Sequence, residues 1–147
     1  MLDTLSTHIN NCDILIMAAA IADYKPKSYS EEKIKKTDDT LTIELTKNID
    51  ILKELSKSKK DNQIFVGFAA ETENLQSNAI KKLKEKNLDL IVANDVSRND
   101  IGFDSDYNEA KLYFKDGNIS ETGRKLKTDI AKIIVTESAI LLNGLGG

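Results

Sequence analysis

Uninterrupted runs of apolar residues alternate along this chain with segments whose apolar residues recur at helical spacing. The apolar runs occupy residues 14–21, 64–70 and 88–92. A run without alternation is typical of a strand that is covered on both faces, as in a parallel sheet. Helical spacing is found over residues 2–11, 51–55, 75–83 and 127–142. The pattern therefore predicts an α/β fold with a mainly parallel sheet flanked by helices.

Two segments carry a different pattern. Residues 41–46 alternate apolar and polar side chains strictly, which predicts a half-buried strand. Residues 111–114 and 118–121 flank Asp116-Gly117, a dipeptide that favours a tight turn between antiparallel strands. We therefore expect a C-terminal β-hairpin before the final helix.

The remaining segments are polar or rich in glycine. Residues 27–40 predict a long loop, and a long loop in a compact domain is often functional. We expect Asn48 to cap the helix over residues 51–55, with Asp50 in its first turn. The Gly-rich residues 143–147 predict a disordered tail.

The length of 147 residues is that of a single domain. A nucleotide-binding α/β domain normally begins with a strand and a Gly-rich turn that binds phosphate, whereas this chain opens inside a predicted helix. We therefore expect residues 1–147 to form one domain that lacks its N-terminal part. Ligands of such sheets bind beyond the carboxyl ends of the strands, which here are residues 19–23, 68–71 and 93–95.

Composition excludes several classes of function. Lys+Arg 21 against Asp+Glu 24 gives a net charge of -3, which offers no general support for nucleic-acid binding. The longest apolar run has eight residues, whereas a membrane-spanning helix needs roughly 20, so we expect no membrane association. A single cysteine forms no internal disulfide and fits a cytoplasmic protein. With one His and one Cys, a His/Cys zinc site is nearly excluded, but a carboxylate-bound metal is not.

The first candidate for ligand chemistry is the stretch of small side chains over residues 17–23, which ends in Asp23. Small side chains let a flat base or a ribose approach the backbone, and the carboxylate can bind a ribose hydroxyl or a cation. Close packing of a helix on the strand, with Asp23 as a cap, explains the same residues equally well.

Two groups of lysines are the other candidates. Residues 33–36 hold three ammonium groups, which suit an oligophosphate. Lys82 and Lys86 are four residues apart and therefore share one face of a predicted helix. A solvated surface is the simpler explanation of either group when it is taken alone.

Six short motifs in a fixed order connect these features. They are Ala19–Tyr24 (AAIADY), Lys33–Lys36 (KIKK), Asn48–Ile51 (NIDI), Val66–Thr72 (VGFAAET), Asp89–Val96 (DLIVANDV) and Gly102–Asn108 (GFDSDYN). In this order the motifs closely resemble the bacterial phosphopantothenate–cysteine ligase family, over about residues 10–135. In many bacteria that ligase is the C-terminal half of a bifunctional flavoprotein of coenzyme A biosynthesis.

The resemblance implies a Rossmann-like fold and the CTP-dependent ligation of 4′-phosphopantothenate with L-cysteine through an acyl-cytidylate. The implied partners are therefore CTP, 4′-phosphopantothenate and L-cysteine, with Mg²⁺ as the cofactor that accompanies CTP. FMN belongs only to the fused decarboxylase domain, which this sequence lacks. The resemblance also implies a homodimer, or a higher oligomer through the fused domain.

Site residues follow from the same resemblance. It implies that Lys33 is catalytic and stabilises charge at the transferring phosphate, that Lys82 and Lys86 bind phosphates, and that Asp23 and Asp50 hold the metal. The CTP-binding residues that it implies are Met17, Ala18, Ala19, Asp23, Lys33, Asn48, Ile49, Asp50, Ile51, Phe68, Lys82 and Lys86.

The sequence departs from the family pattern in two places. Ile49 stands where the family has a proline, which removes rigidity but no functional side chain. The family's N-terminal Gly-rich segment and an asparagine of the second half-reaction have no counterpart, so we expect this fragment to be inactive alone. Two alternatives stay open: a nucleotide- or NAD(P)-binding module without ligase chemistry, and an oligomerisation unit whose hairpin, residues 109–121, pairs across a dimer.

Overall fold

The computed structural model describes residues 1–34, 40–71, 73–95 and 105–145. These residues form two compact units. The larger unit comprises Met1–Ala18 and Ile51–Gly147, and the smaller unit comprises Ala19–Asp50. Among the described residues, none of the helices combines the length and the apolar character that a membrane span requires.

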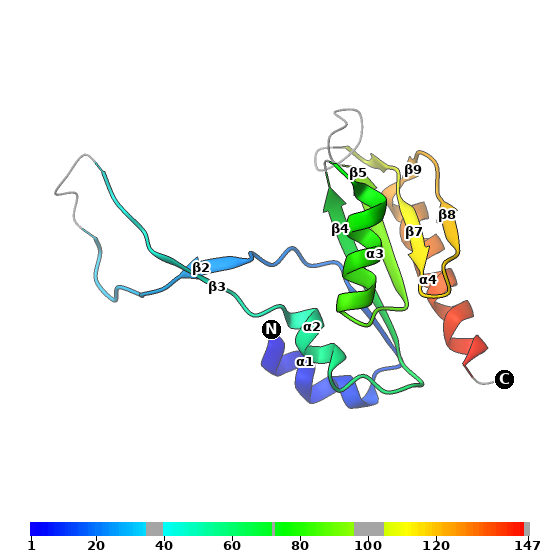
Figure 1. Cartoon of the computed structure of the whole chain (residues 1–147), viewed down its shortest axis with the longest axis horizontal. Coiled ribbons are helices and arrows are strands. Elements are labelled where there is room, and N and C mark those ends of the chain that lie inside the picture. Colours follow the sequence, from blue (N-terminus) through cyan, green and yellow to red (C-terminus); the bar gives the residue numbers. More distant parts are fainter. Residues whose placement is uncertain (35–39, 72, 96–104, 146–147) are drawn as a thin grey trace. The chain divides into compact units, whose positions relative to one another are not determined.

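The larger unit alternates strands and helices (Figure 1). Its helical elements are α1 (Leu2–His8), the 3-10 helix η1 (Ile9–Asn11), α2 (Ile51–Ser56), α3 (Leu75–Glu85) and α4 (Lys127–Gly144). Its strands are β1 (Ile14–Met17), β4 (Ile64–Glu71), β5 (Leu90–Asp95), β6 (Tyr107–Asn108), β7 (Lys111–Phe114), β8 (Ile119–Glu121) and β9 (Lys125–Leu126).

The main sheet has five strands in the order β1-β4-β5-β7-β8. The apolar strands β1, β4 and β5 are parallel, as their uninterrupted apolar runs predict. The pairs β5-β7 and β7-β8 are antiparallel, and Gly117 turns the β7-β8 hairpin at a φ of 95°. The predicted α/β fold with a parallel core, a C-terminal hairpin and a final helix is therefore confirmed.

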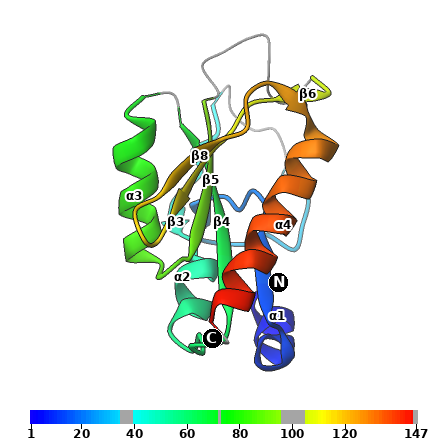
Figure 2. The ribbon, with the colours of Figure 1, turned by 90° about the vertical axis from the view of Figure 1, so that its right-hand side faces the viewer.

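Helices cover both faces of this sheet, with α3 on one face and α4 on the other (Figure 2). On the α4 face, Ile130 and Ile134 pack into a buried cluster with residues of β4, β5 and β7. On the opposite face the backbone of Gly67 lies under two leucines. A Cβ at Gly67 would stand 2.7 Å from Leu88 Cδ1 and 3.1 Å from Leu52 Cδ2. Glycine therefore lets the two leucines pack directly on β4.

Polar side chains join the segments at the amino ends of the parallel strands. Gln63 is 3% exposed, and its Nε2 donates to the carbonyls of Ile9 at 2.6 Å and Cys12 at 2.7 Å. Asp89 Oδ2 accepts the Phe65 N–H at 2.7 Å and lies 2.5 Å from Lys59 Nζ. These contacts fix the starts of β4 and β5 against their neighbours.

The smaller unit contains a two-stranded antiparallel ladder of β2 (Tyr24–Pro26) and β3 (Leu45–Lys47). The prediction of a half-buried strand over residues 41–46 was wrong, because the ladder begins only at Leu45. Leu41 and Ile43 are 64% and 59% exposed. Alternation predicts which residues share a face, but burial also needs a second layer on that face.

Three other predicted boundaries shift. The strand predicted over residues 14–21 ends at Met17, and the strand predicted over 88–92 runs from Leu90 to Asp95. The disordered tail predicted for residues 143–147 was wrong at its start, because α4 continues to Gly144 and Leu145 caps it. Leu141 and Leu142 pack against the core and extend the helix; residues 146–147 lie outside the described residues.

Candidate functional site

The carboxyl ends of β1 and β4 lie side by side in the larger unit. In the parallel register Met17 is the partner of Gly67, and Phe68 follows directly on β4. Phe68 is 37% exposed, whereas the preceding residues 64–67 are all buried. A large aromatic ring that is exposed at the carboxyl end of a parallel strand stands where α/β sheets bind ligands.

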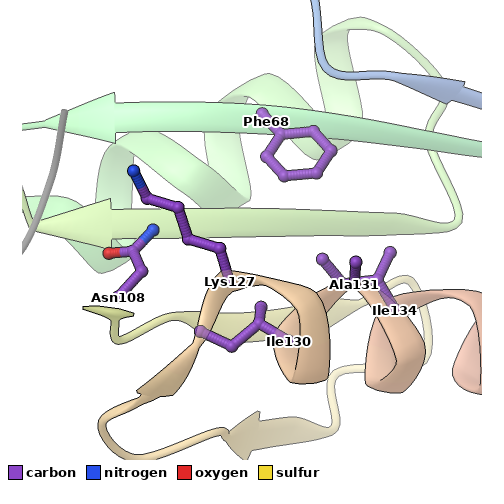
Figure 3. A pocket seen from close by; sticks show the side chains of 6 residues that line it. All are labelled: Phe68, Asn108, Lys127, Ile130, Ala131 and Ile134. Carbon is purple, nitrogen blue, oxygen red and sulfur yellow. The ribbon is translucent and has the colours of Figure 1, made fainter. Parts of the chain in front are cut away.

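Phe68 lines a pocket between the sheet and the first turns of α4 (Figure 3). Side chains alternate along a strand, so Phe68 shares the α4 face of β4 with Val66. An amide and an ammonium group lie at one end of this pocket, and aliphatic side chains form its wall (Figure 3). Its lining residues are Phe68, Asn108, Lys127, Ile130, Ala131 and Ile134.

The other face of β4 carries an ion pair at the same end of the strand. Lys82 Nζ lies 2.5 Å from Glu71 Oε1, and Asn78 Nδ2 donates to Glu71 Oε2 at 3.0 Å. The hydrogen bond from Lys82 lowers the pKa of Glu71, the bond from Asn78 lowers it further, and burial opposes both. Lys82 is therefore held by a carboxylate at the end of β4.

Lys86 follows the last residue of α3 and is half-buried. Its backbone N–H donates to the carbonyls of Lys82, at 3.0 Å, and of Lys84. The sequence predicted Lys82 and Lys86 on one helix face. In the structure Lys82 lies within α3, and Lys86 forms its C-cap.

In the smaller unit Asn48 joins the two segments that hold Asp23 and Asp50. The Asn48 N–H donates to the Asp23 carbonyl at 2.7 Å, and Asn48 Nδ2 donates to the Ala22 carbonyl at 3.0 Å. Asn48 Oδ1 accepts the Ile49 N–H at 3.0 Å. The prediction that Asn48 caps a helix was therefore wrong: α2 begins only at Ile51, so Asp50 also precedes it.

The remaining predicted residues divide between the units. Lys33 is exposed in the smaller unit, and residues 35–36 of its lysine cluster lie outside the described residues. Met17, Ala18, Ile51, Phe68, Lys82 and Lys86 belong to the larger unit, and Ala19, Asp23, Lys33, Asn48, Ile49 and Asp50 belong to the smaller one.

The described residues contain no group of three or more His, Cys, Asp or Glu side chains that could hold a metal ion. An all-protein cage is not needed for Mg²⁺ that arrives with a nucleotide, because phosphates and water supply most of its ligands. One or two carboxylates suffice, so Asp23 and Asp50 have the chemistry that such an ion requires. Their role as its ligands stays a prediction.

Two further residues, Asn94 and Lys127, add polar groups to this part of the larger unit. Asn94 lies at the end of β5, and its buried Oδ1 has no hydrogen-bond partner within the part of the chain that the structure describes. An unpaired buried acceptor is costly, so this atom suits a ligand that donates. Lys127 reaches the Phe68 pocket from the start of α4, and a lysine at a helix start gives no signal in the sequence.

Comparison with known proteins identifies relatives for most of the chain. The family model for the C-terminal domain of DNA/pantothenate metabolism flavoproteins matches residues 1–141. The coenzyme A biosynthesis bifunctional protein CoaBC of Bacillus subtilis is 48% identical over 134 residues, which are 91% of this chain and 33% of that protein. CoaBC of Escherichia coli K12 is 43% identical over 117 residues, 78% of this chain and 29% of that protein. The chain thus spans about a third of these relatives.

A solved structure agrees with these matches. The crystal structure of the C-terminal domain of a CoaBC protein superposes with a TM-score of 0.77 at 36% identity. The match covers 97% of this chain and 61% of that one. A common fold and extensive sequence identity lead to one conclusion: this chain belongs to the family of the C-terminal domain of DNA/pantothenate metabolism flavoproteins.

Proposed function

We propose that this chain is part of a ligase of coenzyme A biosynthesis that joins 4′-phosphopantothenate to L-cysteine, with CTP as the activating nucleotide. The main support is that several residues of the motifs lie together towards the carboxyl ends of the parallel strands, where α/β sheets bind ligands. Met17 lies beside Gly67 and Phe68 at the carboxyl ends of β1 and β4, and the Glu71–Lys82 pair lies at the same end of β4. CoaBC relatives at 43–48% identity carry coenzyme A biosynthesis in their name.

The proposed reaction has two steps. A carboxylate oxygen of 4′-phosphopantothenate attacks the α-phosphorus of CTP, which forms an acyl-cytidylate and releases pyrophosphate. The amine of L-cysteine then attacks the acyl carbon, CMP leaves and one proton is released. Activation is needed because a free carboxylate is a poor electrophile toward an amine.

Both steps bring anions together, so the protein has to supply positive charge at fixed positions. We assign this role to Lys33 at the transferring phosphate and to Lys82 and Lys86 at the phosphate tail. Asp23 and Asp50 would hold Mg²⁺, which neutralises phosphate charge when bound. The residues proposed to contact the nucleotide are Met17, Ala18, Ala19, Asn48, Ile49, Ile51 and Phe68.

The whole protein's properties are part of the same proposal. It would act in the cytoplasm as a homodimer or a higher oligomer, with FMN bound only by a fused decarboxylase domain. Because the chain spans about a third of its CoaBC relatives, turnover would need segments beyond these residues. Nucleotide binding is the activity to look for first in the chain itself.

The test is a titration of the 147-residue chain, labelled for NMR, with CTP–Mg²⁺, ATP–Mg²⁺ and NADPH at equal concentrations. We expect CTP–Mg²⁺ to shift the Phe68 resonances most strongly. Shifts with NADPH alone would contradict the ligase proposal and favour a dinucleotide-binding module. Pyrophosphate release is measured in parallel with CTP, 4′-phosphopantothenate and Mg²⁺, and release by the chain alone would contradict its expected inactivity.

A further inference from the structure

The polar end of the Phe68 pocket carries two side chains whose chemistry points to a particular kind of ligand. Asn108 and Lys127 lie there together, and Ala131 and Ile134 lie at the other end, with Phe68 across from them (Figure 3). An aromatic ring and an aliphatic wall suit a flat ring, and the two polar groups can read its edge. The identity of that ring depends on which of the polar groups donate and which accept.

Local hydrogen bonds fix the answer for Asn108. Its Oδ1 accepts the N–H of Glu109 at 2.9 Å, which orients the side-chain amide. The Nδ2 group of Asn108 is therefore the group that can donate to a ligand. The Lys127 ammonium carries only donors. The polar end of the pocket thus contains donors from two side chains. Lys127 already has an interaction within the protein, but its ammonium carries three N–H groups and can donate to a ligand as well.

The backbone holds these two donors near each other. Asn108 pairs with Lys125 in the β6-β9 ladder, which brings β6 alongside the residues that lead into α4. The Lys127 N–H donates to the carbonyl of Asp106 at 2.9 Å, so the chain before β6 satisfies an N-terminal amide of α4. Asn108 and Lys127 therefore stand on paired segments rather than on independent loops.

Among cytosine, uracil and adenine, the bases of CTP, UTP and ATP, cytosine matches a pair of donors best. Its Watson–Crick edge presents two adjacent acceptors, O2 and N3, followed by the donor N4–H₂. Uracil presents a donor, N3–H, between two acceptors, and adenine presents the single acceptor N1 beside the donor N6–H₂. A site with two adjacent donors can therefore bond both acceptors of cytosine. With uracil one of the donors faces the N3–H donor, and with adenine one of the donors has no acceptor.

We propose that Asn108 and Lys127 read the cytosine of CTP, with Asn108 Nδ2 donating to one of the adjacent acceptors O2 and N3 and Lys127 Nζ to the other, while the ring lies against Phe68. The proposal rests on the proposed function, since it names the residues that select the nucleotide of that reaction. It assigns a specificity-determining role to two residues outside the set that the motifs single out as nucleotide ligands.

The decisive variant is Asn108→Asp, since Oδ1 still accepts the Glu109 N–H while the donor becomes an acceptor. An acceptor at this position pairs with the N3–H of uracil and repels N3 of cytosine. We expect the ratio of CTP to UTP affinity to fall by about 100-fold, because CTP loses the hydrogen bond from residue 108 and UTP gains a hydrogen bond to it. The added negative charge weakens both nucleotides alike, so it cancels in the ratio.

A second variant and a control complete the experiment. Lys127→Met should lower the affinity for CTP by about tenfold more than it lowers the affinity for ATP. Lys132→Met is the matched control, because Lys132 lies on the same helix, is exposed and pairs with Asp129 at 2.9 Å. It should leave the ratios of CTP to UTP and of CTP to ATP affinity unchanged. Affinities are measured by NMR titration of the 147-residue chain, with the side-chain amide signal of Asn108 as a direct probe.

The outcomes separate this proposal from the function on which it rests. If CTP–Mg²⁺ at millimolar concentration shifts no NMR signal of the wild-type chain, the proposed function and the base-reading role are both overturned. If CTP binds but the Asn108 amide signal stays in place, or if both variants keep the wild-type nucleotide ratios, only the base-reading role is overturned.

Discussion

Glu71 and Lys82 form an ion pair with 2.5 Å between Oε1 and Nζ, which joins the carboxyl end of β4 to the last turn of α3. The carboxylate is mostly buried and is also bonded by Asn78. The ammonium of Lys82 is thus positioned at the carboxyl end of β4 by a neighbouring carboxylate.

The lowered pKa of Glu71 predicts an acid-dependent loss of stability. Because the pKa is lower in the folded state than its ordinary value of 4.5, the carboxylate stabilises the fold above pH 4.5. This contribution disappears as the pH falls through the lowered pKa. Glu71→Gln should therefore show a shallower loss of unfolding free energy on acidification than the wild type, measured by urea denaturation across a pH series. Glu73→Gln, an exposed neighbour, should behave as the wild type; equal slopes for all three proteins would contradict the prediction.

Lys82→Met should weaken binding of CTP–Mg²⁺ by about tenfold, since a charge-assisted bond to phosphate is lost. Lys81→Met is the matched control, because Lys81 is the preceding residue on α3 and its side chain is 70% exposed. The affinities are compared by titration at low and high salt, and the difference should shrink in high salt. Equal affinities for both variants would rule out the phosphate role of Lys82.

Gly67→Ala should destabilise the larger unit by about 1–3 kcal/mol. The new Cβ would stand 2.7 Å from Leu88 Cδ1, so Leu88 has to move within a packed core. Gly144→Ala is the control, because a Cβ there meets no atom within 4 Å. Urea denaturation measures both variants, and a Gly67→Ala protein as stable as the wild type would show that the leucines relax freely.

Asp89→Asn should cost about 3–5 kcal/mol of unfolding free energy, since it leaves the ammonium of Lys59 buried without its countercharge. The side chain of Lys59 is only 5% exposed, and its Nζ lies 2.5 Å from Asp89 Oδ2. Adding Lys59→Met to Asp89→Asn should recover part of the loss. The control is Glu85→Gln, which breaks the exposed pair with Lys81 at 4.0 Å and should cost less than about 1 kcal/mol. A loss of the same size in both single variants would refute the argument from burial.

Gln63→Leu should destabilise the chain by about 3 kcal/mol, because the carbonyls of Ile9 and Cys12 lose the Gln63 amide as a donor and the Lys60 N–H loses its acceptor. Leucine fills a similar volume, so the loss reports hydrogen bonding rather than a cavity. Hydrogen exchange of the backbone amides should become faster in α1 and η1 before it does so elsewhere in the chain. Asn62→Ala changes the exposed neighbouring residue and should be neutral. An unchanged denaturation midpoint for Gln63→Leu would contradict the prediction.

The sequence predicted those parts of the fold whose local pattern has a single physical meaning. The unbroken apolar run over residues 64–70 belongs to a strand that is buried on both faces over residues 64–67, and Asp116-Gly117 forms the turn of a hairpin. The alternating pattern over residues 41–46 gave a wrong prediction, because alternation does not show whether another element covers the apolar face of the strand. The prediction of a disordered tail over residues 143–147 was wrong at its start, because Leu141 and Leu142 pack against the core and α4 continues to Gly144.

For the candidate site, the sequence alone predicted most of the candidate residues, because short motifs preserve the type and the order of side chains. The folded chain was needed to show which groups lie together: Glu71 with Lys82 across β4 and α3, and Asn108 with Lys127 beside Phe68. Such pairs come from elements brought together by the burial of apolar surface, which leaves no periodic trace in the chain. The direction of each donor, as at Asn108, depends on hydrogen bonds that exist only after the chain has folded.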